Sequence, residues 1–348
     1  MSRISRRNFM KVAGFSALAV TAACNTADEG VAAAPATARV PLPTQQAVTL
    51  ANAPSEIRLT PVTEFYRQSY GEIPDVTAGG WRLTIDGLVQ NPQSFTLDDL
   101  KALPAVEELR TLECIGNPVG GPLIGTAQWK GVYLQTLLDA IKVRPEAVRA
   151  KFQAADDYFT SVYNEWILHP QTMLIYEMNG GPLTREHGFP LRLLMPGLYG
   201  QKNPKWLTHI EFSDKVESGY WEKQGWSDIA SVQTNSLIQQ PANLANVAGT
   251  TVPVFGVAFA GLRKILAVDV QVDDGEWQPA RMLQTDSSLV WTQWSFDWPA
   301  VEGKHTLTVR AADEAGFVQT ERSQALLGDA YPAGTSKLHS VVVKVKTG

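Results

Sequence analysis

The spacing of apolar and polar residues along the sequence changes near residue 235, and this change constrains the fold more than any other feature. Beyond it, apolar and polar residues alternate in short runs, over 268–272, 294–298, 307–311 and 341–345, and turn formers such as Asp274-Gly275 separate the runs. A period of two places the apolar side chains on one face of a strand. Several short strands joined by tight turns predict an all-β sandwich of the immunoglobulin type over 235–348.

The region from 51 to 230 mixes strand and helix patterns. Residues 81–89 alternate at period two and predict a strand, whereas Thr96, followed three residues later by Asp99, predicts a capped helix start. Apolar residues within 131–141 recur at helical spacing. The mixture predicts an α+β domain over 51–230.

The N-terminus is typical of an export signal. Residues 1–24 combine a basic start, a short apolar stretch and small residues before Cys24, and the stretch is too short to span a bilayer. Within them, Ser5-Arg6-Arg7-Asn8-Phe9-Met10-Lys11 resembles the twin-arginine motif, which implies the twin-arginine translocase as a partner and a periplasmic or exported location. The route carries folded proteins, often with a cofactor already inserted. Residues 25–50, rich in Ala, Thr and Pro, predict a linker.

Cys24 leaves two alternatives open. It follows Thr21-Ala22-Ala23, which resembles a lipoprotein cleavage box except for the Thr, so lipid anchoring through Cys24 and simple cleavage near Ala23 both fit. Several acyl chains would anchor the protein firmly, whereas a single chain would hold it weakly.

Composition excludes several classes of protein. The net charge of −5 and the scattered basic residues argue against a nucleic-acid partner. The only cysteines of the 348 residues are Cys24 and Cys114, so a disulfide scaffold, a multi-cysteine zinc site and an iron–sulfur cluster are excluded. No C-x-x-C-H motif for haem attachment occurs. If the protein is a redox enzyme, its electrons must therefore pass to or from an external carrier, such as a cytochrome or a quinol-linked partner.

Cys114 is the candidate for chemistry. It precedes Gly116-Asn117-Pro118, where a strand should end and a tight turn begin. A thiolate there suits a soft or high-valent metal if a cofactor supplies the remaining ligands. Spacing alone equally fits an inert, buried cysteine.

Three segments together resemble the sulfite oxidase family of molybdopterin-dependent oxidoreductases. Cys-x-Gly-Asn is followed by Trp129-Lys130-Gly131-Val132, and the later segments are 176–183 and 187–207, which carry Y-E-x-N-G-x-P-L, H-G-x-P-x-R and K-W-L. The resemblance covers about 51–345. It implies a molybdenum–molybdopterin cofactor, with Cys114 as the metal ligand and a pterin dithiolene supplying two more sulfurs.

The resemblance also implies roles for further residues. A weaker match at Phe65-Tyr66-Arg67 implies that an aromatic residue and Arg67 reach the pterin and the substrate oxyanion, and the C-terminal domain would serve homodimerisation. Arg offers a planar fork for phosphate and Lys a point charge, which suits both to a pterin phosphate. The predicted catalytic set is Cys114, Arg67 and Trp226, and the predicted cofactor-binding set is Cys114, Arg67, Asn117, His187, Arg192, Lys202 and Lys205.

The substrate pocket departs from the family pattern. Arg67-Gln68-Ser69 lacks the His of R-x-H, Trp226 stands where a tyrosine is expected, and Thr292 replaces an arginine of W-R-x-W. Loss of a charge-assisted anchor from a dianion site costs about 1.5–3 kcal/mol. The pattern therefore favours a larger or less charged small-molecule substrate over sulfite.

Three functions remain open. The first is two-electron or oxygen-atom transfer on a sulfur compound at molybdenum, and the second is periplasmic reduction of a sulfoxide-type substrate. The third is a non-catalytic exported binding protein on an enzyme-derived fold, with Cys114 as a spectator. No G-x-S-x-G or H-E-x-x-H motif supports hydrolysis.

Overall fold

The computed structural model describes residues 57–283, 287–322 and 329–346. The predicted signal peptide (1–24), the predicted linker (25–50) and Cys24 lie outside the described residues. None of the described helices is both long and apolar enough to cross a membrane.

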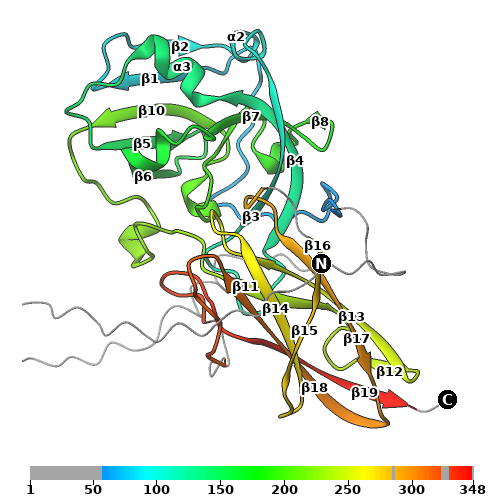
Figure 1. Ribbon diagram of the computed structural model, residues 1–348. Helices are drawn as coiled ribbons and strands as arrows, with labels where there is room; N and C mark the ends of the chain where they lie inside the picture. Colours follow the sequence, from blue (N-terminus) through cyan, green and yellow to red (C-terminus); the bar gives the residue numbers. More distant parts are fainter. Residues whose placement is uncertain (1–56, 284–286, 323–328, 347–348) are drawn as a thin grey trace, which may run out of the picture. The chain divides into compact units, whose positions relative to one another are not determined.

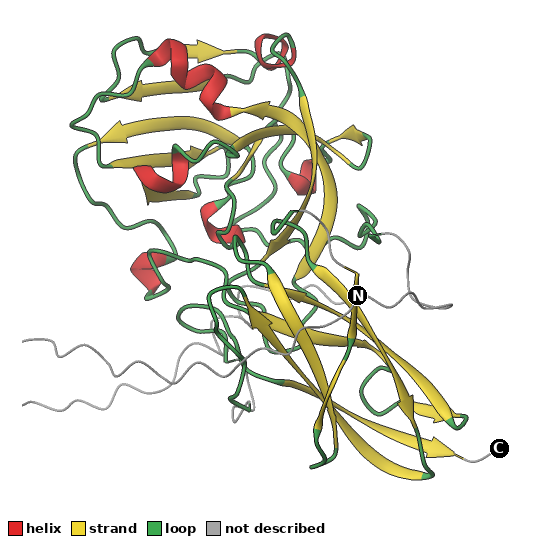
Figure 2. Ribbon diagram, in the orientation of Figure 1, coloured by secondary structure: helices red, strands yellow, loops and turns green. Residues whose placement is uncertain are grey.

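Strands dominate the described chain, and its helices are few and short (Figure 2). The longest helix has eight residues. The fold is therefore mostly β. The predicted α+β domain over 51–230 is confirmed only in part, since short helices accompany the strands of this first region. The helices are α2 (Leu97–Lys101), α3 (Leu134–Ile141), α4 (Asn164–Ile167) and the 3-10 turns η1 (Arg185–His187), η2 (Gly200–Lys202) and η3 (Glu222–Gln224).

Two sheets build the first region. In the first, strands β1, β10, β5 and β6 lie side by side, with β2 at the edge (Figure 1). Strand β1 pairs with β10 in parallel, and the other pairs are antiparallel. The second has the order β3-β4-β7-β8, and β9 also pairs with β7. The strands are β1 (Leu83–Gly87), β2 (Gln93–Phe95), β5 (Arg149–Ala154), β6 (Phe159–Tyr163) and β10 (Leu207–Ser213), then β3 (Val106–Glu113), β4 (Ile124–Tyr133), β7 (Met173–Met178), β8 (Gly181–Pro182) and β9 (Arg192–Leu194).

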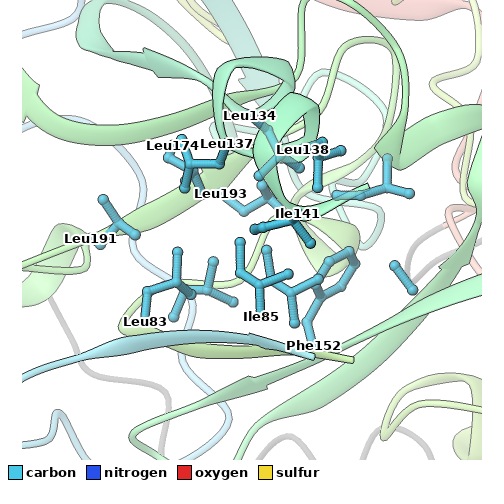
Figure 3. Packing of buried hydrophobic residues seen from close by; sticks show 14 of the residues in the cluster. Leu83, Ile85, Leu134, Leu137, Leu138, Ile141, Phe152, Leu174, Leu191 and Leu193 are labelled. Carbon is cyan, nitrogen blue, oxygen red and sulfur yellow. The ribbon is translucent and has the colours of Figure 1, made fainter. Parts of the chain in front are cut away.

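Helix α3 fills the space between these sheets. Its apolar face points at side chains of β1 and β5 and at Leu174 and Leu193 of the second sheet (Figure 3). All of these side chains are buried. The apolar period of 3.6 in α3 and the period of two in β1 thus meet in one core. The members labelled in Figure 3 are Leu83, Ile85, Leu134, Leu137, Leu138, Ile141, Phe152, Leu174, Leu191 and Leu193.

Two further sheets follow, and their inner faces share one apolar core. Their strand orders are β11-β13-β17-β16 and β12-β19-β18-β14-β15. Valines of β14, β18 and β19 meet Trp294 and Trp298 in this core. The strands are β11 (Asn235–Gln240), β13 (Thr251–Phe259), β16 (Arg281–Leu283) and β17 (Thr292–Pro299), then β12 (Asn246–Ala248), β14 (Ile265–Val272), β15 (Trp277–Pro279), β18 (Gly303–Asp313) and β19 (His339–Lys346).

Most local predictions are confirmed, with two differences. Thr96 and Asp99 form a reciprocal capping box, and Asp274-Gly275 lies in the turn joining β14 to β15. The segment 131–141 begins as the end of β4 and turns helical only at Leu134, because its first residues extend the pairing with β7.

The second difference concerns the outer face of β17. Its alternation predicts exposed polar residues, yet Gln293 and Ser295 are buried. The neighbouring Val257, Phe259 and Trp291 pack with Ile115 and Ile124 of the first region, so this end of the sheet is covered.

Two phenylalanines on paired strands test the contribution of the first core. Phe152 on β5 is 2% exposed, whereas Phe159 on β6 is 37% exposed. We expect Phe152→Ala to lower the free energy of unfolding by about 3–5 kcal/mol, because it leaves a cavity under α3. Phe159→Ala, which loses mainly a contact with Lys223, should cost less than about 1 kcal/mol. Denaturant unfolding measures both, and equal losses would contradict this assignment of the core.

Candidate functional site

Cys114 begins a tight turn directly after β3. Its N–H donates to the Leu123 carbonyl and its carbonyl accepts from the Asn117 N–H, each at 2.9 Å. The side chain is half-buried, and burial raises the pKa of its thiol to about 11. In the unliganded protein the thiol is therefore neutral at pH 7, and a bound metal cation would be needed to favour the thiolate.

A buried carboxylate, Glu113, braces this turn. Its two oxygens accept hydrogen bonds from Asn117 Nδ2 at 3.0 Å and Asn235 Nδ2 at 2.9 Å. Burial raises the pKa of Glu113 to about 7, which the two amides only partly offset. Glu113 is not among the site residues predicted from the sequence. The sequence feature that could have identified it is a single acidic residue between Leu112 and Cys114, at an otherwise apolar strand end.

The Asn117 side chain makes its hydrogen bonds within the turn. Besides its bond to Glu113, its Oδ1 accepts from the Leu123 N–H at 2.9 Å. The structure therefore gives Asn117 a role in shaping the loop that presents Cys114. Its contact with a cofactor stays a prediction.

Three predicted residues meet around Gly188. A Cβ on Gly188 would lie 3.0 Å from Lys205 Cβ and 3.2 Å from Arg192 Cβ, and the φ of Gly188 is +106°. Glycine is favoured here for both reasons, since it adopts this φ without strain and allows the close approach. His187 ends η1 just before it, and its carbonyl accepts from Arg192 Nη1 at 3.3 Å.

These groups carry excess positive charge. Burial and the neighbouring Arg192 lower the pKa of Lys205 to about 7, and the same two causes lower the pKa of His187 to about 4. Burial lowers the pKa of Arg192 itself to about 10. His187 is therefore neutral, and its Nε2 lies 3.0 Å from the Val62 carbonyl, which fits an N–H donor there.

Arg67 belongs to the same neighbourhood. Its side chain is exposed, and its charge contributes to lowering the pKa of both Lys205 and His187. Two residues on, Ser69 Oγ accepts from Lys205 Nζ at 3.1 Å. The loop that follows Phe65 thus lies beside Lys205. Arg67 and Lys205 can contact a shared anion from these positions.

Tyr66 belongs to the weaker match at Phe65-Tyr66-Arg67. Its hydroxyl oxygen is buried and has no hydrogen-bond partner among the described residues. A Cβ on Gly200 would lie 2.9 Å from this oxygen and 3.5 Å from the Glu113 carbonyl. The hydroxyl therefore lies close to the residue that precedes Cys114.

Trp226 lies over the Cys114 turn. A Cβ on Gly116 would be 3.5 Å from the Trp226 ring and 3.9 Å from Cys114 Sγ. The ring also packs against Tyr331, at 5.2 Å between centroids in an edge-to-face arrangement. The Trp226 ring therefore lies near the thiol and brings no charge to it.

The Trp291-Thr292 segment reaches the same strand from the C-terminal sheets. The Trp291 N–H donates to Thr111 Oγ1 at 2.8 Å, three residues before Cys114. Thr292 is buried and brings no charge to this region.

Lys202 is placed apart from the other predicted cations. Its ammonium is fully buried and donates to Glu222 Oε1 and, at 2.8 Å, to the Ser161 carbonyl. Asp228 lies 3.4 Å away and also pairs with Arg149. Lys202 is thus committed to an internal ion network that holds the 222–228 segment, which carries Trp226. A direct bond from Lys202 to a cofactor stays a prediction.

The residues present fit an anionic cofactor that also brings a metal to Cys114. The ion pairs in the described part of the chain involve other cations, such as Arg149 with Asp228 and Lys130 with Glu177, and none involves Arg67, Arg192 or Lys205. Arg192 Nε and the Tyr66 hydroxyl are buried without partners in that same part. Buried charges and buried donors usually have partners, so a bound anion with several acceptors accounts for both observations. No cluster of three or more His, Cys, Asp or Glu residues capable of holding a metal occurs among the described residues.

Two family models match the chain. The oxidoreductase molybdopterin-binding domain matches residues 70–221, and the Mo-co oxidoreductase dimerisation domain matches residues 227–330. The fold and this site thus define a molybdopterin-binding oxidoreductase chain. It belongs to the sulfite oxidase family.

Characterised relatives are similar over much of the chain. Mitochondrial sulfite oxidase of Drosophila melanogaster is 28% identical over 82% of this chain and 59% of its own length, and Arabidopsis thaliana sulfite oxidase is 28% identical over 77% and 84%. An Azospira oryzae protein, provisionally named protein-methionine-sulfoxide reductase subunit YedZ1, is 37% identical over 45% of this chain and 58% of its own. The chain thus spans about three fifths of the Drosophila and Azospira proteins.

A solved structure shares the fold. The sulfane dehydrogenase SoxCD from Paracoccus pantotrophus superposes with a TM-score of 0.73 over 85% of each chain, at 24% identity. The likeness extends over both halves of the described chain.

The pKa of Lys205 gives a test of the anion site. Below pH 7 its ammonium is charged in the unliganded protein, and above pH 7 it must take up a proton to bind an anion. We expect the affinity of cofactor-free protein for sulfate to fall by up to about tenfold for each pH unit above 7. Calorimetric titration at several pH values measures this dependence.

Two variants serve as controls for that titration. Lys205→Arg keeps the charge at all these pH values, so it should bind sulfate with little pH dependence. Lys205→Met should bind weakly throughout. A wild-type affinity that stays constant between about pH 6 and pH 9 would contradict the assignment.

Proposed function

We propose that this chain is a molybdenum-dependent oxidoreductase that carries out two-electron or oxygen-atom transfer on a sulfur compound. The observation that carries the proposal is a group of cations without ion pairs, in the neighbourhood of a single thiol. Arg67, Arg192 and Lys205 form no ion pair in the described chain, and Cys114 lies at the head of a braced turn. Only the weaker, longer-range fields of Asp156 and Glu186 act on Lys205. Such a site requires a ligand that offers an anionic group to the cations and a metal to the thiol. A cofactor that carries a phosphate and a sulfur-bound metal offers both.

Each residue then has a distinct task. Cys114 ligates the metal, and Arg192, Lys205 and Arg67 bind the anionic part of the pterin. His187 keeps its Nε2 proton on the Val62 carbonyl, so its Nδ1 is left as an acceptor for a pterin N–H. Asn117 and Lys202 complete the proposed cofactor-binding set. The molybdenum cofactor, when bound, supplies the two-electron chemistry, and the protein supplies binding, orientation and electrostatics.

The substrate we propose is larger or less charged than sulfite. Trp226, against which Tyr331 packs, brings no positive charge to the Cys114 turn, and neither does buried Thr292. A dianion would lack charge-assisted partners on this side, whereas an organic sulfur compound can pack against the aromatic rings. Arg67 is the proposed cation at the substrate, with Trp226 completing the pocket.

The opposite direction of electron flow is a second candidate. The similarity to the Azospira protein, whose name describes a sulfoxide reductase subunit, favours periplasmic reduction of a sulfoxide-type substrate. A screen of organic sulfides with an artificial electron acceptor, and of sulfoxides with an artificial donor, separates the two directions. A non-catalytic binding protein on the same fold would be active in neither assay.

The remaining proposals concern assembly and location. We propose a catalytic domain over 51–230 and an immunoglobulin-type sandwich over 235–348 that pairs two copies of the chain, which the match to a dimerisation-domain model supports. Electrons would pass to or from an external cytochrome or quinol-linked carrier, without a haem on this chain. The twin-arginine motif at 5–11 supports export to the periplasm, with Cys24 as a candidate lipid anchor.

Metal analysis of the protein purified from its native host tests the proposal. We expect close to one molybdenum per chain in the wild type and loss of most of it in Cys114→Ser, because a hydroxyl is a poor ligand for a soft site. Plasma mass spectrometry measures the metal, and the fluorescence of oxidised pterin measures the cofactor.

Cys24→Ser is the matched control, since it removes the other cysteine of the chain and should leave the molybdenum content unchanged. Wild-type protein without molybdenum or pterin would overturn the proposal and favour the binding-protein alternative.

A further inference from the structure

Tyr331 is exposed, yet it packs against Trp226 from the C-terminal half of the chain. It lies in the connection between β18 and β19, and 58% of its surface is exposed. Its ring meets the Trp226 ring edge-to-face, with an interplanar angle of 82°. Because so much of Tyr331 is exposed, substituting it should change the stability of the fold little. Its effect on Trp226 can therefore be separated from folding.

The backbone around this contact is held in place. The Ser227 N–H donates to the Pro332 carbonyl at 2.9 Å, so the residues that follow the two rings are joined directly. The φ of Gly225 is +91°, and a Cβ there would overlap Tyr331 Oη. Glycine at this position therefore permits the backbone conformation and also leaves room for the tyrosine.

The same connection is anchored a second time at Tyr199. The φ of Gly334 is +85°, and a Cβ there would overlap Tyr199 Oη, so the backbone lies directly on this tyrosine. Tyr199 is buried in an apolar cluster with Ile115, the residue next to the thiol. Trp226 packs against the same cluster. The 331–334 segment and the Trp226 segment thus rest on one support.

The Trp226 ring has the Cys114 turn as another neighbour. The ring lies 3.5 Å from a Cβ placed on Gly116, and that point is 3.9 Å from Cys114 Sγ. The backbone before Trp226 is fixed by η3, whose Glu222 belongs to the internal ion network. The direction of the ring, in contrast, depends on the side chains that pack against it.

We propose that Tyr331 is a positioning residue that holds the Trp226 ring beside Cys114, so that a turn of the C-terminal sheets sets the shape of the substrate pocket. The inference rests on the proposed function, which makes this space a substrate pocket. A ring held in this way binds the organic part of a sulfur compound rather than a dianion, because it carries no charge.

Alkylation of Cys114 by N-ethylmaleimide tests the positioning in cofactor-free protein. In the full chain carrying Cys24→Ser, Cys114 is the only thiol. We expect Trp226→Ala and Tyr331→Ala each to raise the rate of alkylation several-fold, because the ring then no longer restricts access to the sulfur. The double variant should react no faster than Trp226→Ala, since two residues that act through one contact are not additive.

Two variants serve as controls for the alkylation. Tyr331→Phe keeps the edge-to-face contact and should react at the wild-type rate. Phe317→Ala removes another exposed ring of the region after β18, 44% exposed, and should also leave the rate unchanged. The Tm of Tyr331→Ala should stay close to that of the wild type, so that faster alkylation does not reflect unfolding.

In the molybdenum-loaded protein the expected change is in KM. The probes are methyl phenyl sulfide with an artificial electron acceptor and methyl phenyl sulfoxide with an artificial donor. In the active direction, we expect Tyr331→Ala to raise KM about two- to tenfold and to leave kcat near the wild-type value, because it weakens binding without touching the reacting atoms. Tyr331→Phe should restore the wild-type KM, and the molybdenum content should be the same in all three proteins.

Several results would overturn the proposal. A wild-type rate of alkylation in Tyr331→Ala or in Trp226→Ala would do so, and so would effects that multiply in the double variant. An unchanged KM in Tyr331→Ala would remove its role in the substrate pocket. Wild-type protein without molybdenum would remove the proposed function, whereas the alkylation rates would still decide whether Tyr331 positions Trp226.

Discussion

The site depends on two cations, Arg192 and Lys205, that the fold holds near each other and that form no ion pair among the described residues. Folding alone would favour separating them or adding an acid, since mutual repulsion and burial both lower the pKa of Lys205. The fold does the reverse, because Gly188 carries no side chain at a point that lies 3.0 Å from Lys205 Cβ and 3.2 Å from Arg192 Cβ. The unfavourable free energy of holding the two cations near each other is offset only when an anion binds. The other residues of the site are arranged around the place where this anion would bind.

The two halves of the described chain meet at the strand that presents the thiol. Glu113 is shared by Asn117 of the turn and Asn235 of β11, while Thr111 receives a hydrogen bond from the Trp291 backbone. Apolar contacts around Ile115 close the same junction. The geometry of the Cys114 turn is therefore fixed from both sides, in the manner expected of a preorganised metal site.

Sequence patterns predicted much of this, and the failures have physical causes. Period-two alternation located β14, β17, β18 and β19, and the capping box at Thr96 is present, because these signals depend on neighbours in the chain. The sequence motifs predicted one common site for His187, Arg192 and Lys205, and the structure places all three around Gly188. Glu113 was missed because a shared carboxylate is defined by contacts between distant segments. Lys202 lies within the same motif, yet its partner Glu222 could not be read from spacing.

The shared carboxylate has a consequence for biosynthesis. Asn235 is made more than a hundred residues after Glu113, so the carboxylate has only one of its two amide donors until the C-terminal strands are in place. The turn that presents the thiol therefore lacks this brace until the chain has been made as far as β11. A chain shortened to its first half would leave one oxygen of Glu113 without its amide donor.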